Sequence, residues 1–140
     1  MEQLKLENQL CFPFYSVSRL ITRKYQPYLE KIGITYPQYL VLLVLWEEDH
    51  LTVNKIAQKL YLQTNTITPL LKRLEIQGIV SRAKSTEDER KVVISLTAKG
   101  HEMKNRAAEI PFKLREGIDL PDEELISLRN TLNQMIHLLK

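Results

Sequence analysis

What the 140-residue sequence lacks excludes several classes of protein. It contains one cysteine, four glycines and no apolar run near the roughly 20 residues of a membrane span, so we expect no membrane partner. A lone cysteine forms no internal disulfide, which favours a reducing, cytoplasmic location, and the N-terminus shows no signal-peptide pattern. The three histidines form no ligand-spaced cluster with Cys11, so we predict no metal site. Without a glycine-rich phosphate loop or a Gly-x-Ser-x-Gly elbow, the sequence indicates neither a cofactor nor an enzyme.

The charge and hydrophobicity of the chain are compatible with a globular protein that binds nucleic acid. Lys and Arg number 20 against 17 Asp and Glu, and the formal net charge is +3. Because this excess is mild, the distribution of the basic residues must decide whether they serve DNA binding. The hydrophobic fraction of 44% is enough to bury a core. A chain of this length fits one compact domain with helices that pack against a partner.

Amphipathic helices are predicted at both ends of the chain. Residues 8–32 place apolar side chains at helical spacing, and Gly33 is expected to end that helix. Thr97 is expected to cap a helix from about Ala98 through Leu114, and Pro121 to start a last helix. These helices carry more apolar surface than one small domain can cover. We therefore expect a homodimer, in which a two-fold axis buries the same patch twice.

The middle of the chain predicts a helix-turn-helix. A helix near Pro37 is followed by a short helix over 51–60, a turn at 61–63 and a second helix that ends at Gly78. Pro69 leaves two alternatives for this second helix. Either it begins at Pro69 with Thr68 as its cap, or it begins earlier and tolerates the proline in its first turns.

A β-hairpin is predicted directly after this pair of helices. Two β-type runs, Ile79–Ala83 and Val92–Leu96, flank a charged tip from Lys84 to Lys91. A helix-turn-helix followed by a charged hairpin is the winged variant. The fold class is therefore mainly α with a small β-hairpin wing (α+β). We expect one unit over 1–140, with a winged helix-turn-helix at 36–97 and dimerisation helices at 8–32 and 98–140.

The polar face of the second helix and the wing carry residue types that contact DNA. Short hydrogen-bonding side chains near the start of this recognition helix suit base edges in a major groove, and the basic ones after them suit phosphates. In the wing, Arg90 is expected to enter a narrow minor groove, and the acids beside it to hold it when DNA is absent. The alternative is a solvated surface. The candidates are Thr64, Asn65, Thr66, Thr68, Lys72 and Arg73 in the helix, and Arg82, Lys84, Arg90 and Lys91 in the wing.

Several segments resemble the MarR family of winged-helix regulators over nearly the whole chain. They are "LTVNKIAQKLYL" and "TITPLLKRLEIQGIVSRAKSTEDERKVVISLTAKG", within which 88–91 stand at the family's wing signature. The segments "LENQLCFPFY" and "ITYPQYL" resemble the OhrR-type organic-hydroperoxide repressors. This resemblance implies a repressor that binds double-stranded operator DNA and leaves it when an organic hydroperoxide oxidises Cys11. Tyr25 and Tyr36 match the tyrosines that hydrogen-bond the sensing cysteine, and Tyr15 lies one turn from Cys11.

The chain departs from the OhrR pattern at three places. Residues 62–66 read "LQTNT" where close relatives read "LDSGT", so the acidic cap is lost and Thr64 is the candidate replacement. Pro13 is unusual so near the cysteine. No second cysteine follows, so the resemblance implies a one-cysteine sensor that forms a mixed disulfide with a low-molecular-weight thiol.

The function of Cys11 has alternatives that the residues leave open. Most lone cysteines are small buried hydrophobes, although Pro13 suggests that Cys11 lies in a first helical turn, where the helix dipole favours a thiolate. A repressor released by a phenolic or aromatic ligand would need no cysteine chemistry. A thiol peroxidase would need a resolving cysteine, which is absent. A winged protein-interaction module would need no Arg90.

The spacing of Cys11 and Tyr25 predicts how the sensor would be assembled. The two residues are 14 positions apart, or roughly 21 Å along one continuous helix at 1.5 Å per residue. They cannot touch within one chain. They could touch in a dimer whose first helices pack antiparallel.

Overall fold

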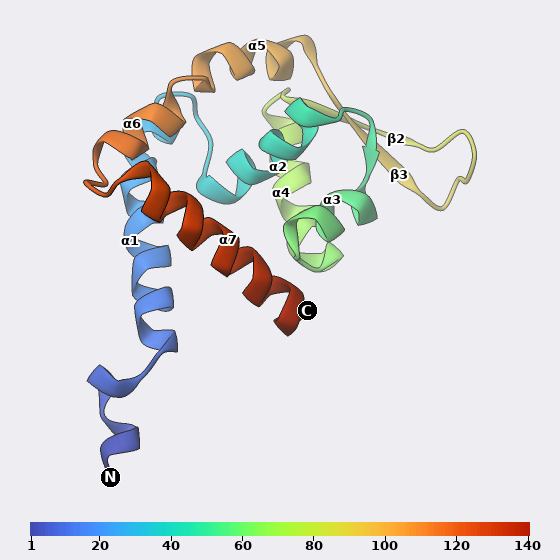
Figure 1. Cartoon of the computed structure of the whole chain (residues 1–140). Helices are drawn as coiled ribbons and strands as arrows, with labels where there is room; N and C mark the ends of the chain where they lie inside the picture. The colour runs from blue at the N-terminus through green and yellow to red at the C-terminus, as the bar shows by residue number, and fades with distance from the viewer. The chain divides into compact units, whose positions relative to one another are not determined.

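The computed structural model describes residues 1–140, which divide into two compact units, Met1–Ile110 and Pro111–Lys140. The first unit contains five α-helices and a three-stranded antiparallel sheet of order β1-β3-β2 (Figure 1). Two short 3-10 turns, Glu2–Leu4 and Leu6–Asn8, precede the first helix. The elements are α1 (Cys11–Glu30), α2 (Tyr36–Glu47), β1 (Leu51–Thr52), α3 (Val53–Leu60), α4 (Thr64–Ile76), β2 (Val80–Lys84), β3 (Val92–Leu96) and α5 (Ala98–Ala107).

The second unit contains α7 (Asp122–Leu139) and all but the first residue of α6 (Ile110–Glu116). The guanidinium of Arg115 lies 2.7 Å from the Asp122 carboxylate, an ion pair that ties the end of α6 to the first turn of α7. No residue of α7 is buried, and no helix of the chain has the length and apolar character needed to cross a membrane.

Local capping signals set most of the helix ends in the first unit. Thr35 and Gln38 form a reciprocal capping box at the start of α2. The hydroxyl of Thr97 accepts a hydrogen bond from Gly100 at the start of α5, as the sequence predicted. Gly33 and Gly78 adopt φ angles of +77° and +74°, which explains why glycine follows α1 and α4. These glycines and Thr97 were correctly predicted as boundaries.

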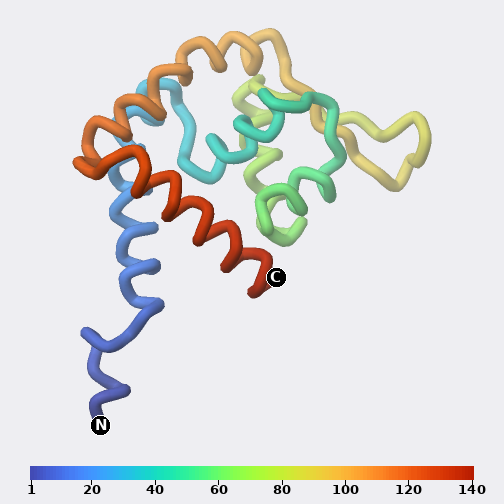
Figure 2. The backbone as a smooth tube through the Cα atoms, in the orientation of Figure 1, coloured from blue at the N-terminus to red at the C-terminus, as the bar shows by residue number.

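The core of the first unit lies between α2, α3, α4 and the sheet. Ile56, Ile67, Leu74 and Ile94 are fully buried there, and they come from α3, α4 and β3. In Figure 2 the β2–β3 hairpin leaves this core as a single extended loop, the wing. The prediction of a mainly α protein with a winged helix-turn-helix is confirmed.

The structure corrects three local predictions. Leu51 was expected in the short helix but lies in β1, where it pairs with Ile94 of β3. The edge of the β2–β3 hairpin supplies this pairing partner, and no local sequence pattern reveals it. The helix predicted over Ala98–Leu114 ends at Ala107 and resumes at Ile110. Pro111 explains this break, because its ring and missing N–H cannot continue a helix interior.

The recognition helix is the third correction. It begins at Thr64, so the alternative in which Thr68 caps a helix starting at Pro69 is wrong. The Thr68 hydroxyl instead donates to the Thr64 carbonyl at 2.8 Å, within the first turns of α4. The suggested Thr64 cap is also wrong, because Gln63 is the N-cap and makes no side-chain cap hydrogen bond.

Candidate nucleic-acid interface and thiol site

Helix α4 presents an apolar face to the core and a polar face to solvent. Ile67, Leu71 and Leu74 are at most 1% exposed, whereas the side of the helix that leaves the core carries the candidate contacts. Asn65, Thr66, Lys72 and Arg73 are exposed, as is Thr64 in the first helical position, and Thr68 is half-buried. The helix is therefore held by its apolar face and leaves amide, hydroxyl and cationic groups free for a groove of DNA.

The wing holds its arginine in a defined position. The Arg90 Nε lies 3.1 Å from Asp88 Oδ1, and its Nη2 donates to Oδ2 at 3.3 Å. The Arg90 backbone N–H also donates to the Asp88 carboxylate. These hydrogen bonds lower the pKa of Asp88, although the Arg90 side chain itself remains 90% exposed. An acid beside Arg90 was expected to hold it, and Asp88 does so.

A cleft connects the wing to the helix-turn-helix. It has a volume of about 230 Å³ and runs from the start of α3 past α4 to the two strands of the wing. No acidic side chain lines it, so it has the size and charge to receive a phosphate group. Sequence reasoning missed Asn54 here; its signal is its place just after the Thr52 cap of α3. The polar lining residues are Thr52, Asn54, Thr68, Arg82, Arg90 and Lys91.

A second, more open depression lies between the C-terminal half of α4 and strand β2. Lys72 of α4 and Arg82 and Lys84 of β2 all line it. The structure therefore brings these three predicted cations together at one surface, beside the cleft that holds Lys91. Arg73 is exposed on α4 but lines neither of these hollows.

Cys11 is the first residue of α1, and it is exposed. Leu10 is the N-cap residue, and its side chain cannot accept a hydrogen bond. The backbone N–H groups of the first turn, where Cys11 lies, therefore have no side-chain cap. One turn along, Tyr15 is 63% exposed, and the Arg19 guanidinium lies 5.2 Å from its ring centroid. The thiol is therefore accessible to a small oxidant.

The predicted tyrosines Tyr25 and Tyr36 belong to an aromatic cluster far from Cys11 in the same chain. Their ring centroids are 4.8 Å apart, and Tyr39 lies 5.7 Å from Tyr25. Tyr39 was not predicted, although the spacing of 36 and 39 places both on one face of α2. Helix α1 is continuous from Cys11 to Glu30, so Cys11 and Tyr25 are about 21 Å apart along its axis.

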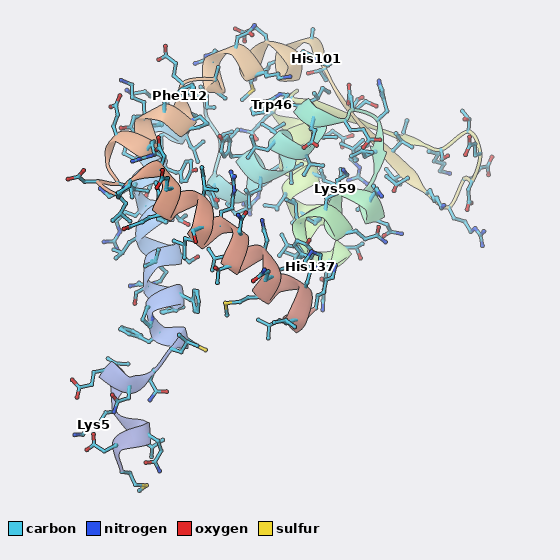
Figure 3. All side chains as sticks on the ribbon, viewed as in Figure 1. Lys5, Trp46, Lys59, His101, Phe112 and His137 are labelled. Atoms are coloured by element: carbon cyan, nitrogen blue, oxygen red, sulfur yellow. The ribbon has the colours of Figure 1, made fainter.

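Burial raises the pKa of these phenols. Desolvation, followed by the neighbouring Tyr36 and Tyr39, raises the pKa of Tyr25 from 10.0 to about 12. Desolvation also raises the pKa of Tyr36 and of Tyr39. Tyr39 in turn contacts Trp46, whose indole N–H donates to the Gly100 carbonyl of α5 at 2.9 Å. Figure 3 labels Trp46 on the ribbon. The cluster is thus a fixed set of neutral O–H donors.

Comparison with known proteins relates this chain to transcriptional regulators. The family model described as transcriptional regulator SarA/Rot matches residues 23–107. The organic hydroperoxide resistance transcriptional regulator of Bacillus subtilis (strain 168) is 47% identical, over 99% of this chain and 94% of the relative. A structure of reduced AbfR bound to DNA, a protein of Staphylococcus epidermidis, is 42% identical with a TM-score of 0.82, covering 99% and 96% of the two chains. Disulfide-formed AbfR is 40% identical with a TM-score of 0.65, covering 97% and 95%.

Proposed function

The chain belongs to the MarR/SarA family of winged helix-turn-helix transcriptional regulators, and from that premise we propose that it is a hydroperoxide-released repressor. It binds operator DNA as a homodimer and dissociates when Cys11 is oxidised. The observation that carries this proposal is an exposed single cysteine at the start of α1, whose other end contributes Tyr25 to a cluster of tyrosines. A regulator with this assignment works in the cytoplasm.

The DNA contacts divide into three kinds. Asn65, Thr66 and Thr68 near the start of α4 read base edges in the major groove, while Lys72 and Arg73 contact phosphates. Arg90 leaves Asp88 and enters the minor groove, where a planar cation meets enhanced negative potential. The cleft below the wing receives a backbone phosphate. Thr64, Arg82, Lys84 and Lys91 complete the contact surface.

A homodimer follows from the apolar surface that a single chain leaves uncovered. On α1, Phe12, Phe14 and Leu20 are 38–49% exposed, and on α7 Ile126 and Leu128 are 49% and 50% exposed. We assign residues 8–32 and 98–140 to dimerisation and 36–97 to DNA binding, within one functional unit. A two-fold axis would place the two recognition helices roughly 34 Å apart, one turn of DNA.

The sensor is assembled between subunits. Because α1 separates Cys11 from Tyr25 by about 21 Å along its axis, the thiol of one chain meets the tyrosines of the other when the two α1 helices pack antiparallel. Tyr25 and Tyr36, whose pKa values are raised by burial, then donate hydrogen bonds from their phenol groups to the thiolate. Tyr15 lies one helical turn from Cys11 in α1 and contributes a further hydroxyl.

The oxidation can be written with all atoms accounted for. The Cys11 thiolate attacks the terminal oxygen of an organic hydroperoxide, the O–O bond breaks, and the alkoxide takes a proton and leaves as an alcohol. The sulfur is now a sulfenic acid. A low-molecular-weight thiol attacks this sulfur, a mixed disulfide forms and water leaves. The added bulk displaces the tyrosines, and the two winged regions lose their match to the two half-sites.

The test compares Cys11→Ser with wild type on DNA from the promoter region beside the protein's own gene. Fluorescence anisotropy should show that both bind in reductant, that cumene hydroperoxide with a small thiol releases only wild type, and that reductant restores binding. Tyr25→Phe should respond more slowly, because the thiolate is less stabilised. Tyr28→Phe is the matched control, since Tyr28 lies on the same helix and contacts Lys31 outside the cluster. A Cys11→Ser protein that still releases DNA under hydroperoxide contradicts the proposal.

A ligand-released repressor is the second candidate, because a groove of about 390 Å³ lies beside Tyr36. Arg19 and Arg23 provide cations along it, and Leu29 and Ile34 provide apolar contacts. This lining suits a small phenolate. Under this alternative, a phenolic ligand should release Cys11→Ser from DNA without any oxidant.

A further inference from the structure

A pair of glutamine side chains joins the loop beside the tyrosine cluster to the end of the recognition helix. Gln38, 4% exposed, is the one polar residue in the buried core of the chain. Its amide Nε2 donates to Oε1 of Gln77 at 3.2 Å, across 39 positions of sequence. A buried amide needs a partner, so this bond restricts where Gln77 can lie.

Gln77 is the C-cap residue of α4, and it holds that end of the helix against the α1–α2 loop. Its Nε2 donates to the Gly33 carbonyl at 2.7 Å. Its own backbone carbonyl accepts from Lys99 of α5 at 2.8 Å. Four elements therefore meet at Gln77: helix α2 through Gln38, the loop after α1, the recognition helix and α5.

The other end of this connection lies at the tyrosines. The Gln38 Oε1 accepts a hydrogen bond from the backbone N–H of Thr35 at 3.0 Å and so completes the capping box of α2. Tyr36 is the first residue of that helix. Tyr36 in turn packs against Tyr25. A displacement of the Tyr36 backbone therefore strains the same amide that positions Gln77.

We propose that Gln38 and Gln77 are positioning residues that couple the thiol sensor to the recognition helix. The inference rests on the proposed function, and it deepens it. With the tyrosines in place, the amide pair holds the C-terminal end of α4 in its DNA-binding orientation. When oxidation moves Tyr36, the pair opens and α4 is released from the loop. The pair does not contact the thiol and lies outside the proposed DNA contacts, so its removal should change the response to oxidation and leave the chemistry at Cys11 intact.

The central measurement is the ratio of the operator dissociation constants of the oxidised and the reduced protein. Gln77→Met keeps the length of the side chain and removes both of its hydrogen bonds. We expect it to lower this ratio at least about fivefold, the scale of a small coupling between two sites. The rate at which a sulfenic-acid probe labels Cys11 under hydroperoxide should stay at the wild-type value. Gln58→Met is the matched control, because Gln58 is an exposed side chain of α3, and its ratio should not change.

A double variant separates coupling from simple stability. Gln38→Met and Gln77→Met each leave an amide unpaired and should lower the melting temperature. Together they remove the unpaired side-chain amide and leave only the Thr35 N–H and the Gly33 carbonyl without these partners, so stability should recover in part. The dissociation-constant ratio should stay low in the double variant, because the connection is still missing. Gln77 is only half-buried, so Gln77→Met retains the test if Gln38→Met fails to fold.

Two results would overturn the inference, and they differ from failure of the proposed function. A wild-type ratio in folded Gln77→Met, or a ratio that returns with stability in the double variant, would assign the pair a structural role alone. Wild-type protein that stays on DNA under hydroperoxide would remove the proposed function, and the coupling with it.

Discussion

The winged region and the helices that flank it differ in how much of their apolar surface one chain covers. In α4, Ile67, Leu71 and Leu74 are at most 1% exposed. In α1, 20 residues long, Leu29 alone is buried, and in α7, 18 residues long, none is. The winged region therefore completes its own core, whereas the flanking helices leave apolar surface uncovered within one chain.

The same contrast separates the two kinds of chemistry. The winged region carries permanent cations that one chain holds ready, with Arg90 placed by Asp88. Under the proposed function the sensor is divided, because Cys11 and Tyr25, a member of the tyrosine cluster, lie near opposite ends of α1. Under the proposed function, each chain holds its own DNA contacts, whereas regulation needs two chains. Four predictions test this division.

The largest effect is expected from breaking the dimer. Leu128→Glu places a charge on the half-exposed apolar face of α7 and should give a monomer in analytical ultracentrifugation. Operator affinity should fall at least about 100-fold, because two linked winged regions no longer bind the two half-sites together. The helical circular dichroism should remain, since the winged core is untouched. Asn130→Glu, on another face of α7, is the control. A dimeric Leu128→Glu protein with normal affinity would assign the interface elsewhere.

A smaller effect is expected in the DNA-binding half. Arg90→Ala should weaken operator binding by roughly 1–3 kcal/mol, and more at A·T-rich flanks, because the minor groove is narrowest there. Dimerisation and the hydroperoxide response should not change. Anisotropy titrations on operators with A·T-rich and G·C-rich flanks measure this.

Lys72→Ala is the comparison for Arg90→Ala. A phosphate contact carries no sequence information, so this variant should weaken specific and non-specific binding alike and reduce the salt dependence. Normal binding by both variants would show that the recognition helix and wing have been misassigned.

The smallest effect is a titration in the sensor half. The pKa of Tyr25 is raised from 10.0 to about 12, so the folded state favours the neutral phenol. The stability that Tyr25 contributes is present below pH 10 and is lost as pH rises towards about 12. Phenolate absorbance should show late-titrating tyrosines, of which Tyr25→Phe removes one. The stability of this variant should fall less steeply as pH rises over the same range. A Tyr25 that titrates at its ordinary pKa would contradict the buried cluster.

Much of the fold could be predicted from residues that act locally. Gly33, Gly78 and Thr97 mark helix ends through their own backbone preferences or side-chain caps, so their positions were correct. The start of α4 was ambiguous because Pro69 disfavours a helix interior locally, while burial of Ile67 and Leu71 favours one. Tertiary packing decided that the helix begins at Thr64.

The site divides in the same way. The polar face of α4 and the cations of the wing were predicted because each lies on one element with a regular period. The cleft with Asn54 and the aromatic cluster with Tyr39 were not, because each joins residues from separate elements. Their chemistry depends on distances between side chains of separate elements, and these distances cannot be derived from the spacing of the residues in the sequence.

The sequence by itself determined the helices, the wing, the residue types offered to DNA and the distance between Cys11 and Tyr25. These follow from periodicity, caps and the fixed rise of a helix. The tertiary structure alone decided that Leu51 pairs with Ile94, that three tyrosines share one desolvated cluster, and that Gln38 holds Gln77. Each of these is a contact between distant positions, and its free energy exists only once the core has brought them together.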